Sequence, residues 1–405
     1  MGVPWNLLVP ILGTLILAKF LHTYFSSPLS SLPGPWYTKF TSWVVDYHWI
    51  RGRRALYVHA LHCKYGVAVR LSPSEVSFMD LGAAKEIYRT GGGFMKSPWY
   101  QKLATNGVVN IFSASDKAFH SGRRRLLAGP LSETSLRHVE PLVDSRVRVT
   151  IDKMRQEMES RGAADVLKWW LFMATDIIGE LSFGESFRML ELGKKNQYII
   201  DIQRAAVFGS LRTTFPLTYK LAGYLNISLF REAHQAGRRI ASYAQQSIQR
   251  YKSMVTSNPT NSKPTLFNKL FNAKVSTGNL LLSDEDIKRE AQSFIIAGSD
   301  TTANTLAYLV WAVCRDSEVQ ERLVNELQTL LPRDDFTHED LRSLRYLDRV
   351  INETLRLYSA APSALPRVVP PSGARIAGHL VPGGTTVSAQ AWSLHRDPSI
   401  FPNPE

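Results

Sequence analysis

Residues 297–302, Ala-Gly-Ser-Asp-Thr-Thr, place an acid, hydroxyl groups and a glycine inside a long apolar helical pattern. Glycine in a helix interior costs about 1 kcal/mol relative to alanine, and the polar side chains compete there for backbone hydrogen bonds. A local opening of the helix at Gly298, beside a ligand, would explain both features. Asp300, together with Thr301 or Thr302, could then pass protons to a bound oxidant. A tolerated polar kink in a core helix is the competing interpretation.

A second group of charged residues follows about fifty positions later. Glu353 and Arg356 are three residues apart and therefore neighbours on one helix face. Most such pairs lie on the surface and contribute little to stability. Here the flanking residues are apolar, which predicts a partly buried, structural ion pair: Leu347, Val350, Ile351, Leu355 and Leu357. Arg367, after Leu365 and Pro366, adds a basic residue at the start of a predicted strand.

The elements that position these residues are mostly helices. Ser283 followed by three acids is a helix start, and the apolar pattern continues to about Cys314, roughly 45 Å at about 1.5 Å per residue. Apolar periodicity predicts further helices, and two alternating segments predict a hairpin. The predicted helices are 136–158, 167–181, 318–331 and 339–357, the hairpin is 67–71 with 75–78, and β-type residues return at 381–387. We therefore expect a mainly α fold with a minor β sheet.

The N-terminal residues predict a membrane anchor. From Val3 to Leu21 the chain is almost entirely apolar, a length that suits a bilayer crossing. Lysine and arginine follow this stretch, which favours a cytoplasmic location for the rest of the chain. We expect an uncleaved transmembrane signal anchor over residues 1–25. Residues 26–36, with Pro33-Gly34-Pro35, form a stiff hinge.

Composition limits the function classes. The formal net charge is +13, which suits a solvated basic surface, an acidic partner or an anionic membrane face. No nucleic-acid-binding motif accompanies this charge, so we expect no nucleic-acid partner. The two cysteines, Cys63 and Cys314, are far apart and have no metal-site spacing, which fits a reducing compartment and predicts no metal site of the cysteine type.

Taken together, these residues resemble the cytochrome P-450 superfamily of haem-thiolate monooxygenases. Residues 297–302 match the Ala-Gly-x-Asp/Glu-Thr-Thr motif of the family's central helix, and Glu353 with Arg356 matches its Glu-x-x-Arg motif. The segment from His120 to Arg124 resembles the family's haem-propionate helix. Residues 395–405 resemble the approach to its haem loop.

The resemblance implies a cytochrome P-450-like fold over residues 37–405, with haem as cofactor. His120, Arg124 and Arg367 would bind the haem propionates. It also implies an NADPH-dependent reductase partner, a hydrophobic small-molecule substrate and a single-pass location in the endoplasmic reticulum membrane. The hinge resembles filamentous-fungal members that oxidise secondary metabolites. Substrate specificity would come from three segments: 97–112, 208–224 and 294–297.

The family's cysteine loop, Phe-x-x-Gly-x-Arg-x-Cys-x-Gly, would follow Glu405 and is absent from these residues. Cys314 lies 12 positions beyond Thr302, about 18 Å along the same helix, and Cys63 belongs to a distant region, so neither can replace the axial thiolate. We therefore expect an incomplete, C-terminally truncated domain that folds poorly and is catalytically inactive. The alternatives are a non-catalytic membrane-bound remnant and a protein that binds apolar ligands without chemistry.

Overall fold

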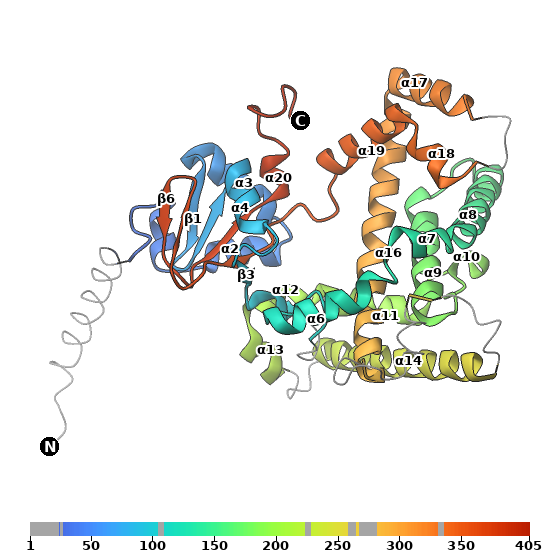
Figure 1. Cartoon of the computed structure of the whole chain (residues 1–405), viewed down its shortest axis with the longest axis horizontal. Helices are drawn as coiled ribbons and strands as arrows, with labels where there is room; N and C mark the ends of the chain where they lie inside the picture. Colours follow the sequence, from blue (N-terminus) through green and yellow to red (C-terminus); the bar gives the residue numbers. More distant parts are fainter. Residues whose placement is uncertain are drawn as a thin grey trace. The chain divides into compact units, whose positions relative to one another are not determined.

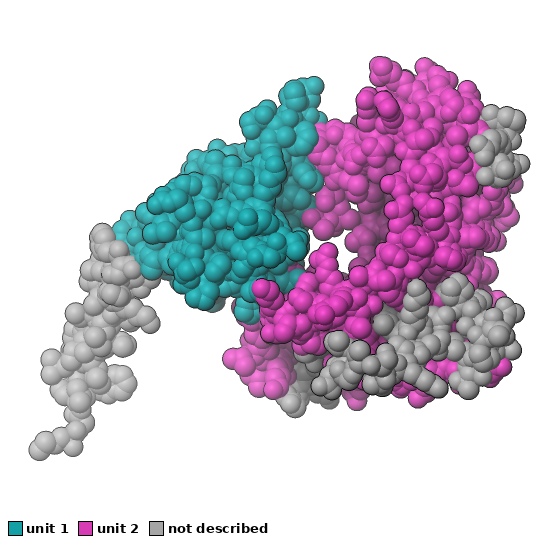
Figure 2. All heavy atoms as spheres, in the orientation of Figure 1, with its two compact units in different colours: residues 1–99, 362–405 teal, residues 100–361 magenta. Residues whose placement is uncertain are grey.

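The computed structural model describes residues 24, 27–103, 109–222, 228–257, 265–266, 282–330 and 336–405. The chain forms two compact units, shown in different colours in Figure 2. Unit 1 comprises Met1–Trp99 and Pro362–Glu405, and unit 2 comprises Tyr100–Ala361. The predicted anchor, Val3 to Leu21, lies outside the described residues. Among the residues that are described, no helix is long and apolar enough to cross a membrane.

Unit 1 contains the minor sheet. Five strands pair in the order β1-β2-β7-β4-β3, and β5 pairs with β6 in a separate two-stranded sheet. The predicted hairpin is confirmed, because β1 and β2 are antiparallel neighbours, while β2 and β7 run parallel. The strands are β1 (Ala68–Ser72), β2 (Glu75–Phe78), β3 (Met95–Lys96), β4 (Arg367–Val368), β5 (Ala374–Ile376), β6 (His379–Val381) and β7 (Thr386–Ala389). The short helices of this unit are η1 (Trp36–Lys39), α2 (Trp43–Ile50), α3 (Arg54–Tyr65), α4 (Leu81–Tyr88) and α20 (Ala391–Leu394).

The Pro-Gly-Pro hinge is packed along strand β1. The backbone N–H of Arg70 donates to the Pro33 carbonyl at 2.8 Å, and its buried guanidinium donates through Nη1 to the Leu29 carbonyl at 2.9 Å. A Cβ atom at Gly34 would lie 2.7 Å from the Arg70 carbonyl oxygen. Only glycine allows the two backbones to approach this closely. The hinge is therefore held against strand β1 at Pro33 and Gly34.

Unit 2 is helical. Figure 1 shows the long helix α16 passing α9, with α14 near one end and α17 at the other. Before α16 the helices are α5 (Trp99–Leu103), α6 (Lys117–Ala128), α7 (Glu133–Arg137), α8 (Glu140–Arg161), α9 (Val166–Phe183), α10 (Met189–Leu192), α11 (Gln197–Val207), α12 (Gly209–Thr214), α13 (Pro216–Ala222) and α14 (Ser228–Ser257). They are followed by α16 (Asp284–Arg315), α17 (Ser317–Gln328), α18 (His338–Arg342) and α19 (Arg345–Leu357). The mainly α fold with a minor sheet is confirmed.

The predicted start of the long helix is also confirmed. Ser283 caps α16 through the backbone N–H of Asp286, and the Asp286 carboxylate accepts in return from the Ser283 backbone. The predicted single helix over 339–357 is wrong, because the chain leaves helical geometry at Leu344 and divides into α18 and α19. The Glu326 carboxylate of α17 accepts the backbone N–H groups of Tyr346 and Leu347, both at 2.8 Å, and so satisfies the new helix start.

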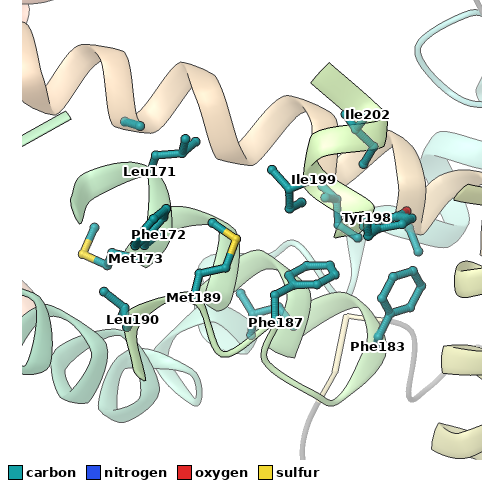
Figure 3. Close-up of a cluster of buried hydrophobic side chains, with 14 of the residues drawn as sticks. Leu171, Phe172, Met173, Phe183, Phe187, Met189, Leu190, Tyr198, Ile199 and Ile202 are labelled. Carbon is teal, nitrogen blue, oxygen red and sulfur yellow. The ribbon is translucent and has the colours of Figure 1, made fainter. Parts of the chain in front are cut away.

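The core of unit 2 is built around α9. Figure 3 shows apolar side chains from α9, α10 and α11 packed together, including Phe172, Met189 and Tyr198. Buried polar groups fix the neighbouring elements to this core. The Asp176 carboxylate accepts the first N–H groups of α10, from Met189 at 3.1 Å and Leu190 at 2.9 Å. Because these N–H groups satisfy both oxygens of the carboxylate, Asp176 can lie inside the core.

Helix α8 is joined to α9 by Glu157. Its carboxylate accepts from Lys168 Nζ at 2.6 Å, from Trp169 Nε1 at 2.6 Å and from Arg161 Nη1 at 2.5 Å. The hydrogen bond from Lys168, supported by those from Trp169, the Asp165 backbone and Arg161, lowers the pKa of Glu157 to about 2. The two helices are therefore held together by a carboxylate that stays ionised well into the acidic range.

Candidate active site

The residues predicted to do chemistry lie in the middle of α16. Ala297, Asp300, Thr301 and Thr302 are exposed within unit 2, whereas Ser299 is buried. The motif thus has one face against the core and another that carries the acid and two threonines. This is the arrangement expected of a helix that presents polar groups to a ligand.

The expected opening of the helix at Gly298 is not found. Helix α16 is continuous from Asp284 to Arg315. A Cβ atom at Gly298 would lie 3.1 Å from Cγ1 of Ile178 on α9, closer than ordinary van der Waals contact. The glycine is therefore explained by the close approach of two helices rather than by a break beside a ligand.

The two threonines differ in their hydrogen bonding. The Thr301 hydroxyl donates to the Ala297 carbonyl one turn earlier, as the Ser299 hydroxyl does to Ile295 at 2.8 Å. Within the described residues, the Thr302 hydroxyl has no protein partner. Of the two hydroxyls, that of Thr302 is therefore the one left available to a ligand or water.

Asp300 is contacted from a neighbouring helix. Gln203 of α11 donates through Nε2 to Asp300 Oδ1 at 3.4 Å, and Lys195 Nζ donates to Gln203 Oε1 at 2.9 Å. Lys195 and Gln203 thus form a chain of hydrogen bonds that ends at the Asp300 carboxylate. Sequence analysis missed both residues, because a separation of 97 positions between Gln203 and Asp300 leaves no local signal.

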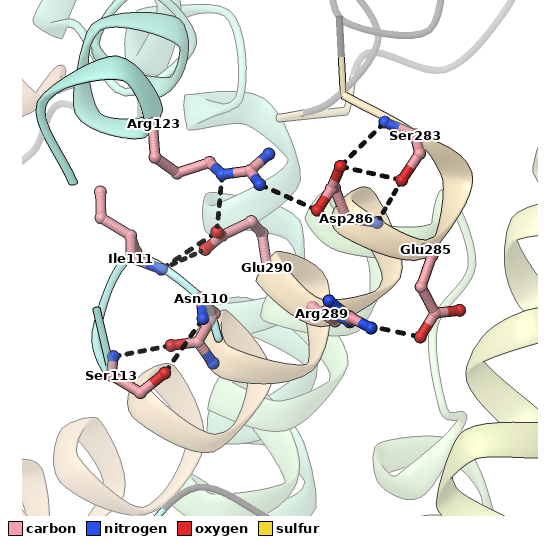
Figure 4. Close-up of polar contacts among 9 residues, drawn as sticks. All are labelled: Asn110, Ile111, Ser113, Arg123, Ser283, Glu285, Asp286, Arg289 and Glu290. Carbon is pink, nitrogen blue, oxygen red and sulfur yellow. Dashed lines mark hydrogen bonds and ion pairs between the residues drawn. The ribbon is translucent and has the colours of Figure 1, made fainter. Parts of the chain in front are cut away.

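The predicted propionate residues His120 and Arg124 lie one turn apart on α6, His120 half-buried and Arg124 exposed. Their neighbour Arg123 points toward α16 (Figure 4). Arg123 donates through Nη2 to Asp286 Oδ1 at 2.8 Å and its Nε lies 3.4 Å from Glu290 Oε1. Arg123 thus fixes α6 to α16 and determines the orientation in which α6 presents His120 and Arg124.

Glu290 extends this cluster to the segment before α6. Its carboxylate is 1% exposed and accepts the backbone N–H of Ile111 through both oxygens, at 3.0 and 3.2 Å. Figure 4 shows Arg123 and Ile111 meeting the same carboxylate. Burial opposes ionisation of the neighbouring Asp286, but hydrogen bonds from Ser283 and the charge of Arg123 lower its pKa overall. One polar cluster thus joins α6 and the segment before it to α16: Arg123, Asp286, Glu290 and the Ile111 backbone.

Arg367 lies on β4 in unit 1. Its Nη1 donates to the Phe94 carbonyl at 3.5 Å, and its guanidinium carbon lies 5.8 Å from the centre of the Tyr88 ring. Its Nε is buried and has no hydrogen-bond partner within the described residues. A half-buried cation with a buried, unused donor fits an anionic group such as a carboxylate.

The Glu353–Arg356 pair has the geometry of a structural ion pair. Arg356 Nε donates to Glu353 Oε2 at 2.8 Å and Nη2 donates to Oε1 at 2.7 Å, a bidentate contact. The arginine side chain is 7% exposed and the glutamate 56%. The hydrogen bonds and charge of Arg356 lower the pKa of Glu353. The predicted partial burial is therefore confirmed, with the arginine as the buried member.

The two cysteines lie in different units. Cys63 is on α3 in unit 1, and Cys314 is in the last turn of α16; both are exposed. In the part of the chain that the structure describes, no group of three or more histidine, cysteine, aspartate or glutamate residues could hold a metal ion.

Comparison with known proteins shows the family of the chain and its fold. Residues 33–405 match the family described as Cytochrome P450. The chain is 46% identical over 397 residues to the cytochrome P450 monooxygenase tazI of Aspergillus terreus, covering 98% of this chain and 80% of that protein. It is 34% identical over 391 residues to the cytochrome P450 monooxygenase stcB of Emericella nidulans, covering 95% and 73%. Among solved structures it resembles the cytochrome P450DA heme domain, with a TM-score of 0.74, 19% identity and coverage of 87% of this chain and 75% of that one.

The chain belongs to the cytochrome P450 family. Its fold is that of a P450 domain, and its relatives include monooxygenases of filamentous fungi. Membership implies haem as the cofactor, and the family typically works with a reductase and hydrophobic substrates.

Proposed function

We propose that this chain provides the distal half of a haem-dependent monooxygenase site that oxidises a hydrophobic small molecule in fungal secondary metabolism. The observation that carries the proposal is the exposed side of α16, which carries Asp300, Thr301 and Thr302, while Ser299 and Ala303 are buried on the other side. Family membership and the fungal relatives support the reaction class.

One set of residues would bind the cofactor, and a second set would handle protons beside it. His120, Arg124 and Arg367 would pair with the haem propionates, and the unused buried Nε of Arg367 fits that role. Haem, when bound, supplies the iron at which oxygen is activated. In our proposal Thr302 holds a water or hydroxyl proton beside that chemistry, and Asp300 exchanges protons with solvent through the Gln203 side of α11.

The residues do not fit the family's requirement for an axial ligand to the haem iron. The family uses a cysteine thiolate, and neither Cys63 nor Cys314 takes the family's position. We therefore propose that these 405 residues, taken alone, do not catalyse monooxygenation and require a segment carrying the cysteine loop. Membrane anchoring through Val3 to Leu21, a location in the endoplasmic reticulum and an NADPH-dependent reductase partner remain part of the same proposal.

The experiment compares two proteins: the 405-residue chain, and a chimera in which a family segment with the cysteine loop follows Glu405. Both are reconstituted with haem, reduced and exposed to carbon monoxide. We expect the thiolate-type absorption band that gives the family its name in the chimera only. The band in the 405-residue chain would overturn the proposed need for the segment. Its absence from a folded, haem-loaded chimera would overturn the proposed monooxygenase site.

Replacing Thr302 in the chimera tests the proton role. The variant T302A should bind haem as the chimera does but should release most of the reducing equivalents as hydrogen peroxide instead of product. The variant T305A is the matched control, because the Thr305 hydroxyl donates to the helix's own Thr301 carbonyl at 2.9 Å. Equal peroxide yields from the two variants would contradict the role of Thr302.

A further inference from the structure

Unit 1 contains a cysteine beside a histidine. Cys63 is exposed in the last turn of α3, and its Sγ lies 3.7 Å from Nε2 of His59, one turn earlier on the same helix. A thiol within hydrogen-bond reach of an imidazole can transfer its proton to that ring, and the thiolate is the reactive form of cysteine.

The imidazole of His59 is held by a third group. Its Nδ1 lies 3.3 Å from the hydroxyl of Ser393 on α20. That hydroxyl accepts from Gln390 Nε2 at 2.6 Å, and the same amide nitrogen donates to the Ala55 carbonyl at 2.9 Å. Gln390 and Ser393 are fully buried, so the serine is fixed and the ring is oriented with Nε2 toward the thiol. A nucleophile, a base and a group that orients the base are thus present in one cluster.

The charges around His59 favour a base rather than a permanent cation. Burial lowers the pKa of His59, the charge of Glu405 opposes this effect and the charge of Arg396 adds to it. His62, on the buried side of α3, is hydrogen-bonded to the Gly66 carbonyl and the Ser77 hydroxyl. Lys64 lies over the Tyr65 ring. The imidazole of His59 is therefore mainly neutral at pH 7 and can accept a proton.

We propose that Cys63 is a thiol-modification site that forms mixed disulfides with small-molecule disulfides, with His59 as its base. The Cys63 proton passes to His59 Nε2, and the thiolate attacks one sulfur of the disulfide. That S–S bond breaks as the new Sγ–S bond forms, and the departing thiolate takes up the proton. The exchange needs no other oxidant, because one disulfide is consumed and one is formed.

Cys314 provides the matched control in the same chain. It is also exposed and also lies in the last turn of a helix. The residue one turn before it is Val310, where Cys63 has His59. A difference in reactivity between the two thiols therefore reports on the histidine rather than on exposure or helix position.

The expected difference follows from general-base catalysis. A base within hydrogen-bond reach of a thiol can take up its proton as the sulfur attacks. Cys63 should therefore react with a disulfide measurably faster than Cys314, which has no histidine at the corresponding helical position.

The test uses the reduced full chain, oxidised glutathione as the probe and peptide mass spectrometry to follow both cysteines over time between pH 6 and 9. We expect Cys63 to react faster than Cys314 at pH 7. The variant H59Q should bring the Cys63 rate to that of Cys314. Equal rates in the unmodified chain, or an undiminished excess in H59Q, would overturn the proposal.

Circular dichroism and limited proteolysis show whether a variant has kept the fold of unit 1. If H59Q has lost that fold, the variant S393A, which removes only the hydroxyl that orients the ring, decides the question in its place. A Cys63 excess that is reduced in folded S393A supports the orienting role. An excess that S393A leaves intact contradicts it.

Discussion

Replacing Arg123 with methionine should destabilise unit 2 strongly. The arginine side chain is 7% exposed and touches two carboxylates of α16, Asp286 at 2.8 Å and Glu290 at 3.4 Å. Methionine keeps much of the volume but removes the charge. The Glu290 carboxylate, 1% exposed, would then lose its arginine partner inside the protein.

The magnitude follows from that burial. Removing one member of a buried ion pair costs about 3–5 kcal/mol, because the remaining charge stays desolvated. The variant E290Q removes the charge but keeps an acceptor for the Ile111 N–H, and should cost less, about 1–3 kcal/mol. In the double variant no buried carboxylate is left at position 290, so its cost should fall below the sum of the two by about 1–3 kcal/mol.

The assay is urea unfolding of the full chain, followed by tryptophan fluorescence and circular dichroism. The single variants and the double variant are compared in one cycle. The control is R155M, since the Arg155–Asp152 pair is exposed on both sides, at 65% and 59%. This control should change stability by less than about 1 kcal/mol.

Additive costs would refute the reasoning. If R123M and E290Q combine to within about 0.5 kcal/mol of their sum, the two side chains do not act as a pair. An R123M cost no larger than that of R155M would show that Arg123 is not buried with α16 in solution.

Three further predictions concern single residues. The variant G298V should lower the free energy of unfolding by about 1–3 kcal/mol through overpacking against Ile178, and the variant I178A should restore part of it in urea unfolding; no cost for G298V would contradict the close helix approach. Because its lysine hydrogen bond, with others, lowers the pKa of Glu157 from 4.5 to about 2, its contribution to stability is present above pH 4.5 and is lost as the pH falls toward 2. The variant E157Q should flatten the acid limb of a stability-against-pH curve, and an unchanged limb would exclude this carboxylate. The variant G34A should cost about 1–3 kcal/mol, because its Cβ would lie 2.7 Å from the Arg70 carbonyl, and should speed protease cleavage of the hinge; equal cleavage rates would show that the hinge is not held on β1.

The sequence by itself determined the features that depend on near neighbours. The start of α16 follows from Ser283 and the acids after it, and the Glu353–Arg356 pair follows from a spacing of three on one helix face. The hairpin of β1 and β2 follows from two alternating segments and the short turn between them. The motif at 297–302 identified the family, which the match over residues 33–405 confirms.

Only the tertiary structure decided the contacts between distant parts of the chain. Gly298 looked like an opening in a helix, and the approach of Ile178 on α9 gives it another cause. The helix break at Leu344 depends on the Glu326 carboxylate, which accepts a hydrogen bond from the backbone N–H of Tyr346, 20 positions later in the chain. Neither Ile178 nor Glu326 can be recognised as a partner from the residues next to Gly298 or Leu344 in the sequence.

The polar clusters follow the same rule. Arg123 is adjacent to a predicted haem residue in sequence, yet it bonds a carboxylate 163 positions away and points into the protein. His59 and Cys63 are one helical turn apart, but the serine that orients the imidazole comes from 334 positions later. Periodicity and caps report the geometry of one element, whereas the direction and partner of a buried charge depend on which elements pack together.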